Sequence, residues 1–397
     1  MRNKLLLLLA FIIIQACQSP PQSTEAPQRW LKGNLHTHSF WSDGDDFPEM
    51  IMDWYKTNDY QFVVLSDHNI LQEGEKWINI AGSKKEKALE RYRNQYGTDW
   101  VETREDTSGL QVRLKTLVEY RSRFDSPDDF LILKSEEISD GYEGKPIHLN
   151  ATNVQELIGP QGGNSVADVM QNNINAVLEQ RERTGQPMIP HINHPNFGWA
   201  VTAQDMMELD NERFFEVYNG HLMVNNYGDS LRSSTEEMWD EINAFYLEMG
   251  KPLLYGLATD DSHNYHQQGP KQSNTGRGWV MVQSNELSAE TIITAMEAGQ
   301  FYSSTGVSLE NIKLENNVYS LQIRGEEGVN YTTQFWGVKQ GGDRGELLAE
   351  TTDAEASYTL SGDELFVRAK VISSTLQPNP FREGDREKAW TQPVTMK

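Results

Sequence analysis

The sequence has almost no cysteine: only one of its 397 residues, Cys17, is a cysteine. One cysteine cannot form a disulfide within the chain, so its position needs another explanation. Runs of lysine or arginine are also missing, and the formal net charge is -23. Such a chain would repel phosphate backbones and anionic headgroups, which argues against binding to nucleic acid. An anionic substrate would need local positive charge, which bound metal ions could supply.

The first residues have the pattern of a targeting segment. A short basic start precedes the apolar run Leu5–Ile14, which is too short to span a bilayer but has the length of a signal-peptide core. Cys17 follows shortly after, and the stretch resembles a bacterial lipoprotein lipobox, in which the cysteine is acylated. We therefore expect a signal peptide over residues 1–16 and a flexible tether over 17–29. An ordinary signal peptide with an incidental cysteine is the alternative.

This prediction places the mature protein outside the cytoplasm. It would be lipid-anchored at the bacterial cell envelope, at the periplasmic or outer-membrane face, and would touch the membrane only through the anchor.

After the tether, short strand-like apolar runs alternate with helical patterns. The strand candidates are residues 62–65, 130–133, 188–189, 214–218 and 253–255. Apolar residues recur at helical spacing over 166–178 and 239–246, and a helix is expected over 288–298, with Ser288 as its cap and Gly299 past its end. Strands that alternate with helices favour parallel pairing in a layered or barrel α/β domain.

Two segments depart from this alternation. Residues 71–129 are polar and helix-prone, notably at 84–93 and 110–123, and predict a helical insertion over one face. From residue 306 the helical pattern stops, and strand-like runs separated by glycine, asparagine and aspartate predict a small antiparallel β domain over 306–397. Those runs are residues 312–314, 319–323, 331–337 and 365–371.

Metal-ligand residue types gather at the ends of the predicted strands. Seven of the nine histidines, all but His221 and His266, lie in such clusters, and most have a carboxylate nearby. His36 and His38 alternate along a strand, so both imidazoles can reach one ion. Since the carboxyl ends of strands form one rim in barrels and related folds, residues far apart in sequence would converge there. The pattern therefore predicts a metal site.

These clusters resemble the motifs of the PHP (polymerase and histidinol phosphatase) metallohydrolases. The matching stretches, in the order of that family, are Asn34–Ser39, Ser42–Gly44, Val64–Asn69, Glu137–Ser139, His148, Asn193–Pro195 and Asp261–His263. The resemblance covers residues 30–305 and implies a distorted (β/α)7 TIM-like barrel with two or three metal ions at its carboxyl-terminal rim. The long insertion and the ending Gly299–Gly306 are similar to the extracytoplasmic members, including those related to carbaryl hydrolases.

The resemblance also implies a ligand set. The implied ligands are His36, His38 and Asp261 for one ion, Glu137 as a bridge, Asp43, His68 and His263 for a second ion, and His148 and His194 for a third. Glu137 is preferred to its neighbour Glu136 because the apolar Ile138 follows it, as the pattern expects. A set this rich in histidine suits zinc, manganese or iron better than calcium or magnesium.

The expected nucleophile is metal-bound water, because clustered ions produce hydroxide near neutral pH and no Gly-x-Ser-x-Gly motif stands at a strand end. Hydrolysis of a small phosphorylated substrate is the first hypothesis, with His191 and Arg277 as candidate substrate contacts. Their alternative roles are structural support and a surface salt bridge. Two further hypotheses are hydrolysis of a carbamate, amide or ester at the same centre, and a surface-binding lipoprotein without catalysis.

Overall fold

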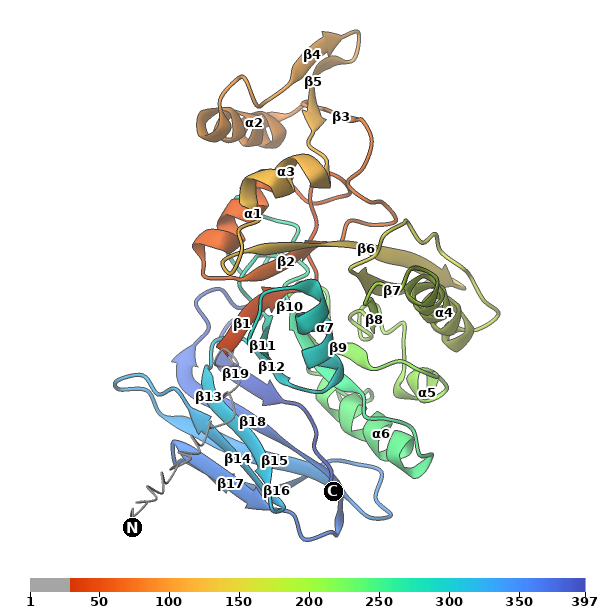
Figure 1. The fold of residues 1–397 in the computed structure, drawn as a ribbon, viewed down its shortest axis with the longest axis vertical. Helices are drawn as coiled ribbons and strands as arrows, with labels where there is room; N and C mark the ends of the chain where they lie inside the picture. The colour runs from red at the N-terminus through yellow and green to blue at the C-terminus, as the bar shows by residue number, and fades with distance from the viewer. Residues whose placement is uncertain (1–28, 397) are drawn as a thin grey trace, which may run out of the picture.

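A 13-stranded mixed sheet runs through the computed structural model of the protein, which describes residues 29–396 (Figure 1). Strand β1 (Arg29–Asn34) lies inside this sheet, between β2 (Phe62–Leu65) and β11 (Trp279–Ser284). Beyond β2 the order is β6 (Leu131–Tyr142), β7 (Lys145–Thr152), β8 (Ile189–Ile192), β9 (Phe214–Asn219) and β10 (Tyr255–Thr259). Beyond β11 the order is β12 (Phe301–Ser304), β19 (Arg386–Thr391), β18 (Glu364–Leu376), β15 (Tyr331–Lys339) and β16 (Glu346–Thr351).

Only part of this sheet is parallel. The pairs β1–β2, β2–β6, β8–β9 and β9–β10 are parallel, as the alternation of strands and helices predicts, so the fold is mixed α/β. The pairs β6–β7, β7–β8 and β1–β11 are antiparallel. One cause is a tight hairpin turn between β6 and β7, where Glu143 and Gly144 have φ angles of 50° and 79°.

The resemblance implies a distorted (β/α)7 barrel, and no closed barrel is seen among the described residues. Strands β10 and β1 have no hydrogen-bonded ladder between them. Their continuations meet instead at one isolated bridge, between Thr37 and Ser262. The sheet therefore curves until its parallel strands converge at their carboxyl ends without closing along their length.

Five helices accompany these strands: α1 (Pro48–Thr57), α4 (Val166–Thr184), α5 (Ala203–Met207), α6 (Thr235–Glu248) and α7 (Ala289–Glu297). Local sequence explains their ends. Ser288 caps α7 by accepting from the N–H of Thr291, and Gly299 follows the helix with a φ of 70°. Ser165 caps α4 in the same way, and Gly185 ends that helix in the left-handed conformation.

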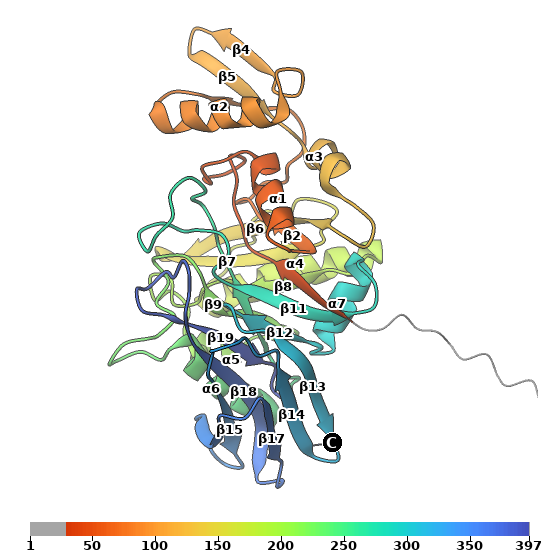
Figure 2. The ribbon, with the colours of Figure 1, turned by 90° about the vertical axis from the view of Figure 1, so that its left-hand side faces the viewer.

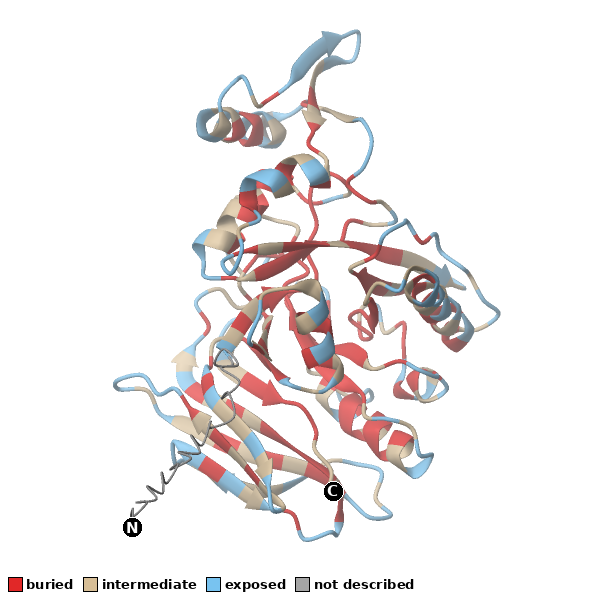
Figure 3. Ribbon diagram, in the orientation of Figure 1, coloured by how far each residue is buried: buried red, intermediate tan, exposed pale blue. Residues whose placement is uncertain are grey.

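The strands that carry the site are buried on both faces (Figure 3). One apolar cluster packs β7, β8, β9 and β10 against α4, α5 and α6, and a second packs β1, β2 and β11 against α7. Continuous apolar runs such as Phe62–Leu65 are the pattern of strands covered on both sides, which explains why they were readable from sequence. The run at 253–255 was placed too early, because β10 begins only at Tyr255.

The insertion stands apart at one end of the molecule (Figures 1 and 2). It comprises β3 (Lys76–Asn79), α2 (Ser83–Tyr96), β4 (Thr103–Asp106), β5 (Gly109–Leu114) and α3 (Leu117–Phe124), with the three strands forming a small sheet. The helix expected over 84–93 is present within α2. The prediction of a helix over 110–123 is wrong for its first half. That half is strand β5, in which the side chains of Val112 and Leu114 point inward with the two-residue period of a strand, and only the second half is helical.

Among the described residues beyond 306 the chain forms strands and no helix, as predicted. Strands β13 (Leu309–Glu315), β14 (Val318–Ile323) and β17 (Glu355–Thr359) make a three-stranded antiparallel sheet. The other four strands extend the large sheet, because β19 pairs with both β12 and β18. The guanidinium of Arg368 on β18 binds Asp240 on α6 through two contacts of 2.7 Å, with both side chains buried. That residues 306–397 form a separate domain stays a prediction.

Within residues 29–396, no helix combines the length and apolar character needed to cross a membrane. The predicted signal peptide, the tether before Arg29 and the acylated Cys17 lie outside the described residues.

Candidate metal centre

The nine side chains implied as ligands come together at one edge of the sheet, where they form overlapping groups whose nitrogen and oxygen atoms lie within 4.8 Å of one another. Most follow the carboxyl end of a parallel strand: His36 and His38 after β1, His68 after β2, His194 after β8, and Asp261 and His263 after β10. Glu137 and His148 project from the β6–β7 hairpin as diagonal neighbours on one face. Asp43 comes from the turn before α1.

Main-chain hydrogen bonds hold these strand ends in register. The N–H of His38 donates to the carbonyl of Ser262, and the N–H of Asp261 donates to the carbonyl of His36, both at 3.0 Å. The turn that carries Asp43 packs tightly onto the same segment, because a Cβ on Gly44 would lie 2.4 Å from the carbonyl oxygen of His38. Only glycine allows this close approach.

Two of the nine residues have strained backbones. The φ angles of His194 and Asp261 are 21° and 47°, in the left-handed region that side chains other than glycine rarely adopt. Such conformations cost about 1–3 kcal/mol each and persist where the surroundings impose them. Here the strain turns both side chains toward the cluster.

The first group contains His36, His38 and Asp261. The Nε2 atoms of the two imidazoles are 3.1 Å apart, and Asp261 Oδ1 lies 3.3 Å from the first and 3.2 Å from the second. Both histidines are completely buried and Asp261 is nearly so. Three buried donor atoms thus converge on one point.

The second group surrounds the carboxylate of Asp43. His263 Nε2 lies 3.3 Å from Asp43 Oδ1, and His68 Nε2 lies 3.5 Å from it. His38 belongs to this group as well, since its Nδ1 is 3.8 Å from the same oxygen. The two ring nitrogens of His38 therefore point toward different groups, which the resemblance did not imply.

Glu137 lies at the junction of the remaining groups. Its Oε1 is 3.0 Å from His148 Nδ1 and 3.5 Å from both His36 Nε2 and His194 Nε2. His148 and His194 thus approach the same carboxylate oxygen, although each belongs to a different group around it. The carboxylate of Glu136 points elsewhere and accepts from the N–H of Ile158 at 2.6 Å.

The donor set fits divalent cations. Glu137 Oε2 is buried and accepts no hydrogen bond from the described residues, although His38 Nε2 is 3.4 Å away and His68 Nδ1 only 2.7 Å away. Buried polar atoms are almost always satisfied, so a buried carboxylate oxygen that accepts no hydrogen bond needs a further partner. Atoms about 2 Å from a shared ion are separated by distances of this order.

Electrostatic interactions keep the carboxylates ionised. Burial raises the pKa of Glu137, but the charges of His148, His36 and His68 outweigh it and hold this pKa well below its ordinary value. Burial lowers the pKa of His36, but Asp261, Glu216 and Glu137 outweigh it and hold this pKa well above its ordinary value. The carboxylates thus attract protons to the neighbouring imidazoles, and a cation bound there would displace those protons.

Sequence reasoning missed Glu216, which is completely buried on β9. Its Oε1 is 2.7 Å from His36 Nδ1 and accepts from Thr259 Oγ1 at 2.8 Å, while Oε2 accepts from the N–H of His194 at 2.8 Å. It forms a further potential metal group with His36 and His191. The available signal was a lone carboxylate within the apolar run 214–218.

Sequence reasoning also set aside His221, which the structure places beside the cluster. Its ring centroid is 5.3 Å from that of His263 and 5.9 Å from that of Phe197. Its Nδ1 accepts from the N–H of Met223 at 3.3 Å, so Nε2 carries the proton of the neutral ring. His221 follows the end of β9, the same kind of position that identified the other histidines.

The two candidate substrate contacts lie in different surroundings. Arg277 is buried, and its guanidinium donates to the carbonyls of Gly220, Gly269, Gln272 and Asn379. Each of its nitrogens is engaged, so the arginine holds loops together and has no free N–H for a substrate, which corrects the expectation. His191 is completely buried under the cluster, with Nε2 3.5 Å from Glu216 Oε1, and this position suits support of the site better than contact with substrate.

A cavity of about 370 Å³ opens beside Asp43. It lies between the turn that carries this carboxylate and the insertion. Its lining residues are Phe40, Ser42, Asp43, Gly44, Asp45, Lys76, Ile78, Lys84 and Lys85.

No protein-family model and no curated protein matches the chain. Among solved structures, the chain is similar to a two-domain protein from Bacteroides vulgatus that contains a predicted PHP-like metal-dependent phosphoesterase, with 14% identity and a TM-score of 0.38, over 96% of this chain and 100% of the other. It is also similar to an amidohydrolase from Chromobacterium violaceum, with 12% identity and a TM-score of 0.30, over 58% of this chain and 87% of the other. Function is therefore inferred from the geometry of the site.

Proposed function

We propose that this chain is a metal-dependent phosphoesterase that holds two or three divalent ions. The observation that carries the proposal is the carboxylate of Glu137, which is buried among five histidines and whose Oε2 accepts no hydrogen bond from the described residues. Burying such a group is costly unless a counter-ion compensates it. Zinc, manganese or iron suits this mixture of imidazole and carboxylate donors.

Each group has a proposed role in holding the ions. His36, His38 and Asp261 would hold one ion, and His68, His263 and Asp43 a second. His148 and His194, which approach Glu137 Oε1 from different sides, would serve a third position or complete the coordination of the others. Glu137 would bridge, because its two oxygens face different histidines.

Clustered divalent ions activate water and neutralise the charge that develops on substrate oxygens. The residues of this chain fix the positions of the ligand side chains. The backbone conformations of His194 and Asp261 turn their side chains toward the centre, and main-chain hydrogen bonds hold the strand ends together. His221 presents an N–H at the edge of the cluster, where it could donate to a substrate or leaving-group oxygen. Phosphoesters are preferred as substrates because a multi-ion centre clamps both attacking and leaving oxygens.

The proposal includes an envelope location. We propose that Cys17 is acylated and that the protein belongs to the extracytoplasmic PHP branch, for which the long insertion is the supporting feature. Labelled palmitate should be incorporated into the full chain in a bacterial host and not into the Cys17→Ser variant. Equal labelling of the wild-type chain and the Cys17→Ser variant would show that Cys17 is not the site of acylation.

Metal analysis and hydrolysis assays test the enzymatic proposal. Purified wild-type protein should contain divalent metal and hydrolyse a phosphomonoester or phosphodiester probe, and chelation or His36→Ala should abolish both properties. His266→Ala is the matched control for metal content, because this histidine lies outside every ligand group. Activity that survives chelation and His36→Ala would overturn the mechanism. If the protein hydrolyses only carbamate or ester probes, the proposed substrate class is wrong and the proposed metal centre stands.

A further inference from the structure

Basic side chains from the insertion gather beside the proposed metal centre. The cavity next to Asp43 is lined by Lys76, Lys84 and Lys85. A neighbouring cavity of about 190 Å³ shares Lys84 and Asp45 with it and is also lined by Lys87, Arg91 and His266. The five lysine and arginine side chains of these two cavities are called the cationic rim below.

This concentration is unusual for the chain, in which 58 acidic residues outnumber 35 basic ones. Within residues 29–396, no side chain of the cationic rim forms an ion pair with a carboxylate. Several other cations of the insertion do: Arg113 and Lys115 share Glu102 at 2.6 Å, and Arg104 approaches Glu75. The cationic rim is thus a set of positive charges without a carboxylate at ion-pair distance among the described residues.

Two carboxylates that line the cavities, Asp43 and Asp45, have other partners. Asp43 belongs to the proposed metal centre. The carboxylate of Asp45 accepts from the N–H of Tyr265 at 2.8 Å and from the amide of Asn264 at 3.3 Å. The guanidinium of Arg91 contacts the ring of His266, which in turn donates from Nε2 to the carbonyl of Asp45 at 2.7 Å.

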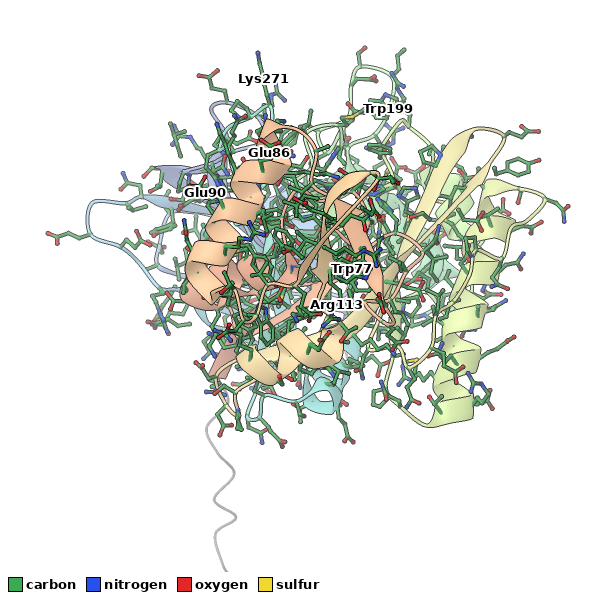
Figure 4. All side chains as sticks on the ribbon, turned by 90° about the horizontal axis from the view of Figure 1, so that it is seen from above. Trp77, Glu86, Glu90, Arg113, Trp199 and Lys271 are labelled. Carbon is green, nitrogen blue, oxygen red and sulfur yellow. The ribbon has the colours of Figure 1, made fainter. Side chains whose placement is uncertain are left out.

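Helix α2 fixes most of the rim relative to the centre. Lys84, Lys87 and Arg91 recur at helical spacing on one face, while the buried Tyr92 packs its ring on Phe47 at 4.1 Å and donates to Glu49 at 2.6 Å. Phe47 lies at the end of the loop that carries Asp43. Helix α2 therefore packs directly against the segment that positions this part of the proposed metal centre. Figure 4 views this side of the molecule, with Glu86 and Glu90 on α2 near the loop that carries Lys271.

We infer that the cationic rim is a subsite for a second anionic group on the substrate. This inference rests on the proposed function and narrows it to small molecules that carry one hydrolysable phosphoester and another anionic group, such as a second phosphate. The centre would hold the first group, and the cationic rim would hold the second by charge and hydrogen bonds. The insertion would therefore set substrate selectivity without supplying a metal ligand.

Matched substrates test the inference. The bisphosphates of butanediol and hexanediol should be hydrolysed with at least a tenfold higher kcat/KM than butyl and hexyl phosphate at low ionic strength. The Lys84→Gln/Lys87→Gln variant should lower this ratio about tenfold, and added salt should lower it in the wild type. Arg93→Gln, on the same helix but outside both cavities, is the control that should leave the ratio unchanged.

A binding measurement separates this inference from the proposed function. Calorimetry should detect butanediol bisphosphate binding to His36→Ala protein, and adding Lys84→Gln/Lys87→Gln should weaken it about tenfold. If binding depends on these lysines but the wild-type protein hydrolyses no phosphoester, the subsite stands and the proposed phosphoesterase activity is wrong. Hydrolysis with an unchanged bisphosphate preference in the lysine variant, or no measurable binding of the bisphosphate, would overturn the subsite.

Discussion

Glu216 Oε1 lies 2.7 Å from His36 Nδ1, and both side chains are completely buried. Burial raises the pKa of Glu216, but the charge of His36 and the hydrogen bonds of His191 and His36 outweigh it and lower this pKa below its ordinary value. An ionised carboxylate only accepts, so Nδ1 carries a proton and Nε2 is left to face the cluster. The contact therefore fixes the tautomer that a metal ligand needs.

Glu216→Gln should lower metal affinity about 10- to 100-fold, the effect typical of losing a carboxylate behind a ligating histidine. The amide of glutamine can donate to Nδ1 and so favour the opposite tautomer, in which Nε2 carries the proton. Metal titration by calorimetry measures the change. Glu212→Gln is the matched control: Glu212 is buried just before the same strand, but within residues 29–396 it accepts only from the N–H groups of Arg213 and Phe214. An equal loss in both variants would indicate general disruption of β9.

His221→Ala should lower kcat/KM for a phosphoester about a hundredfold, as removal of one well-placed hydrogen-bond donor does, while metal content stays at the wild-type level. Burial lowers the pKa of His221 to about 4, so the ring is neutral at pH 7 and loses this neutral form as the pH falls through that value. A variant with full activity, or one that has lost its metal, would remove His221 from substrate binding.

Glu136 predicts a specific dependence of stability on pH. Burial raises its pKa to about 8, from an ordinary value of 4.5, so the folded state keeps a proton that the unfolded state releases. This contribution is complete below pH 4.5 and is lost as the pH rises to 8, with a limiting slope of about 1.4 kcal/mol per pH unit. Urea unfolding of Glu136→Gln between pH 5 and pH 9 should show a smaller decline than the wild type, and parallel curves would contradict the assignment.

The contact between Arg368 and Asp240 predicts a large effect on stability. Arg368→Met should lower the free energy of unfolding by about 3–5 kcal/mol, because a buried carboxylate loses its partner. The double variant Arg368→Met/Asp240→Leu should recover much of this loss, since no charge is then left buried. Arg183→Met, at an exposed pair with Glu156, should cost less than about 1 kcal/mol. Similar costs at both sites would contradict the burial argument.

Local signals made part of the fold predictable. The helix after Ser288 and the strand at 62–65 were found because caps, glycine and apolar runs act over a few residues. The direction of β7 was not found, although Glu143 and Gly144 formed a readable two-residue turn. The barrel was expected from the family resemblance, which did not indicate that the strand with His148 forms a hairpin with the preceding strand.

The candidate site was readable to a similar extent. His36, His68 and Asp261 were recognised because ligand types recur after strands, and the structure brings them together. The role of Glu216 depends on His36, which is 180 residues away in sequence, so no local pattern could reveal the contact. The same limit applies to Arg277: whether a guanidinium is free or engaged by loop carbonyls is decided only by tertiary packing.

The position of β19 has a consequence for synthesis of the protein. This strand lies between β12 and β18, so the edge of β12 has no partner until every strand from β13 to β18 has left the ribosome. An unpaired strand edge is a template for misassociation with other chains. Nascent chains that stall before Arg386 should therefore need holdase protection.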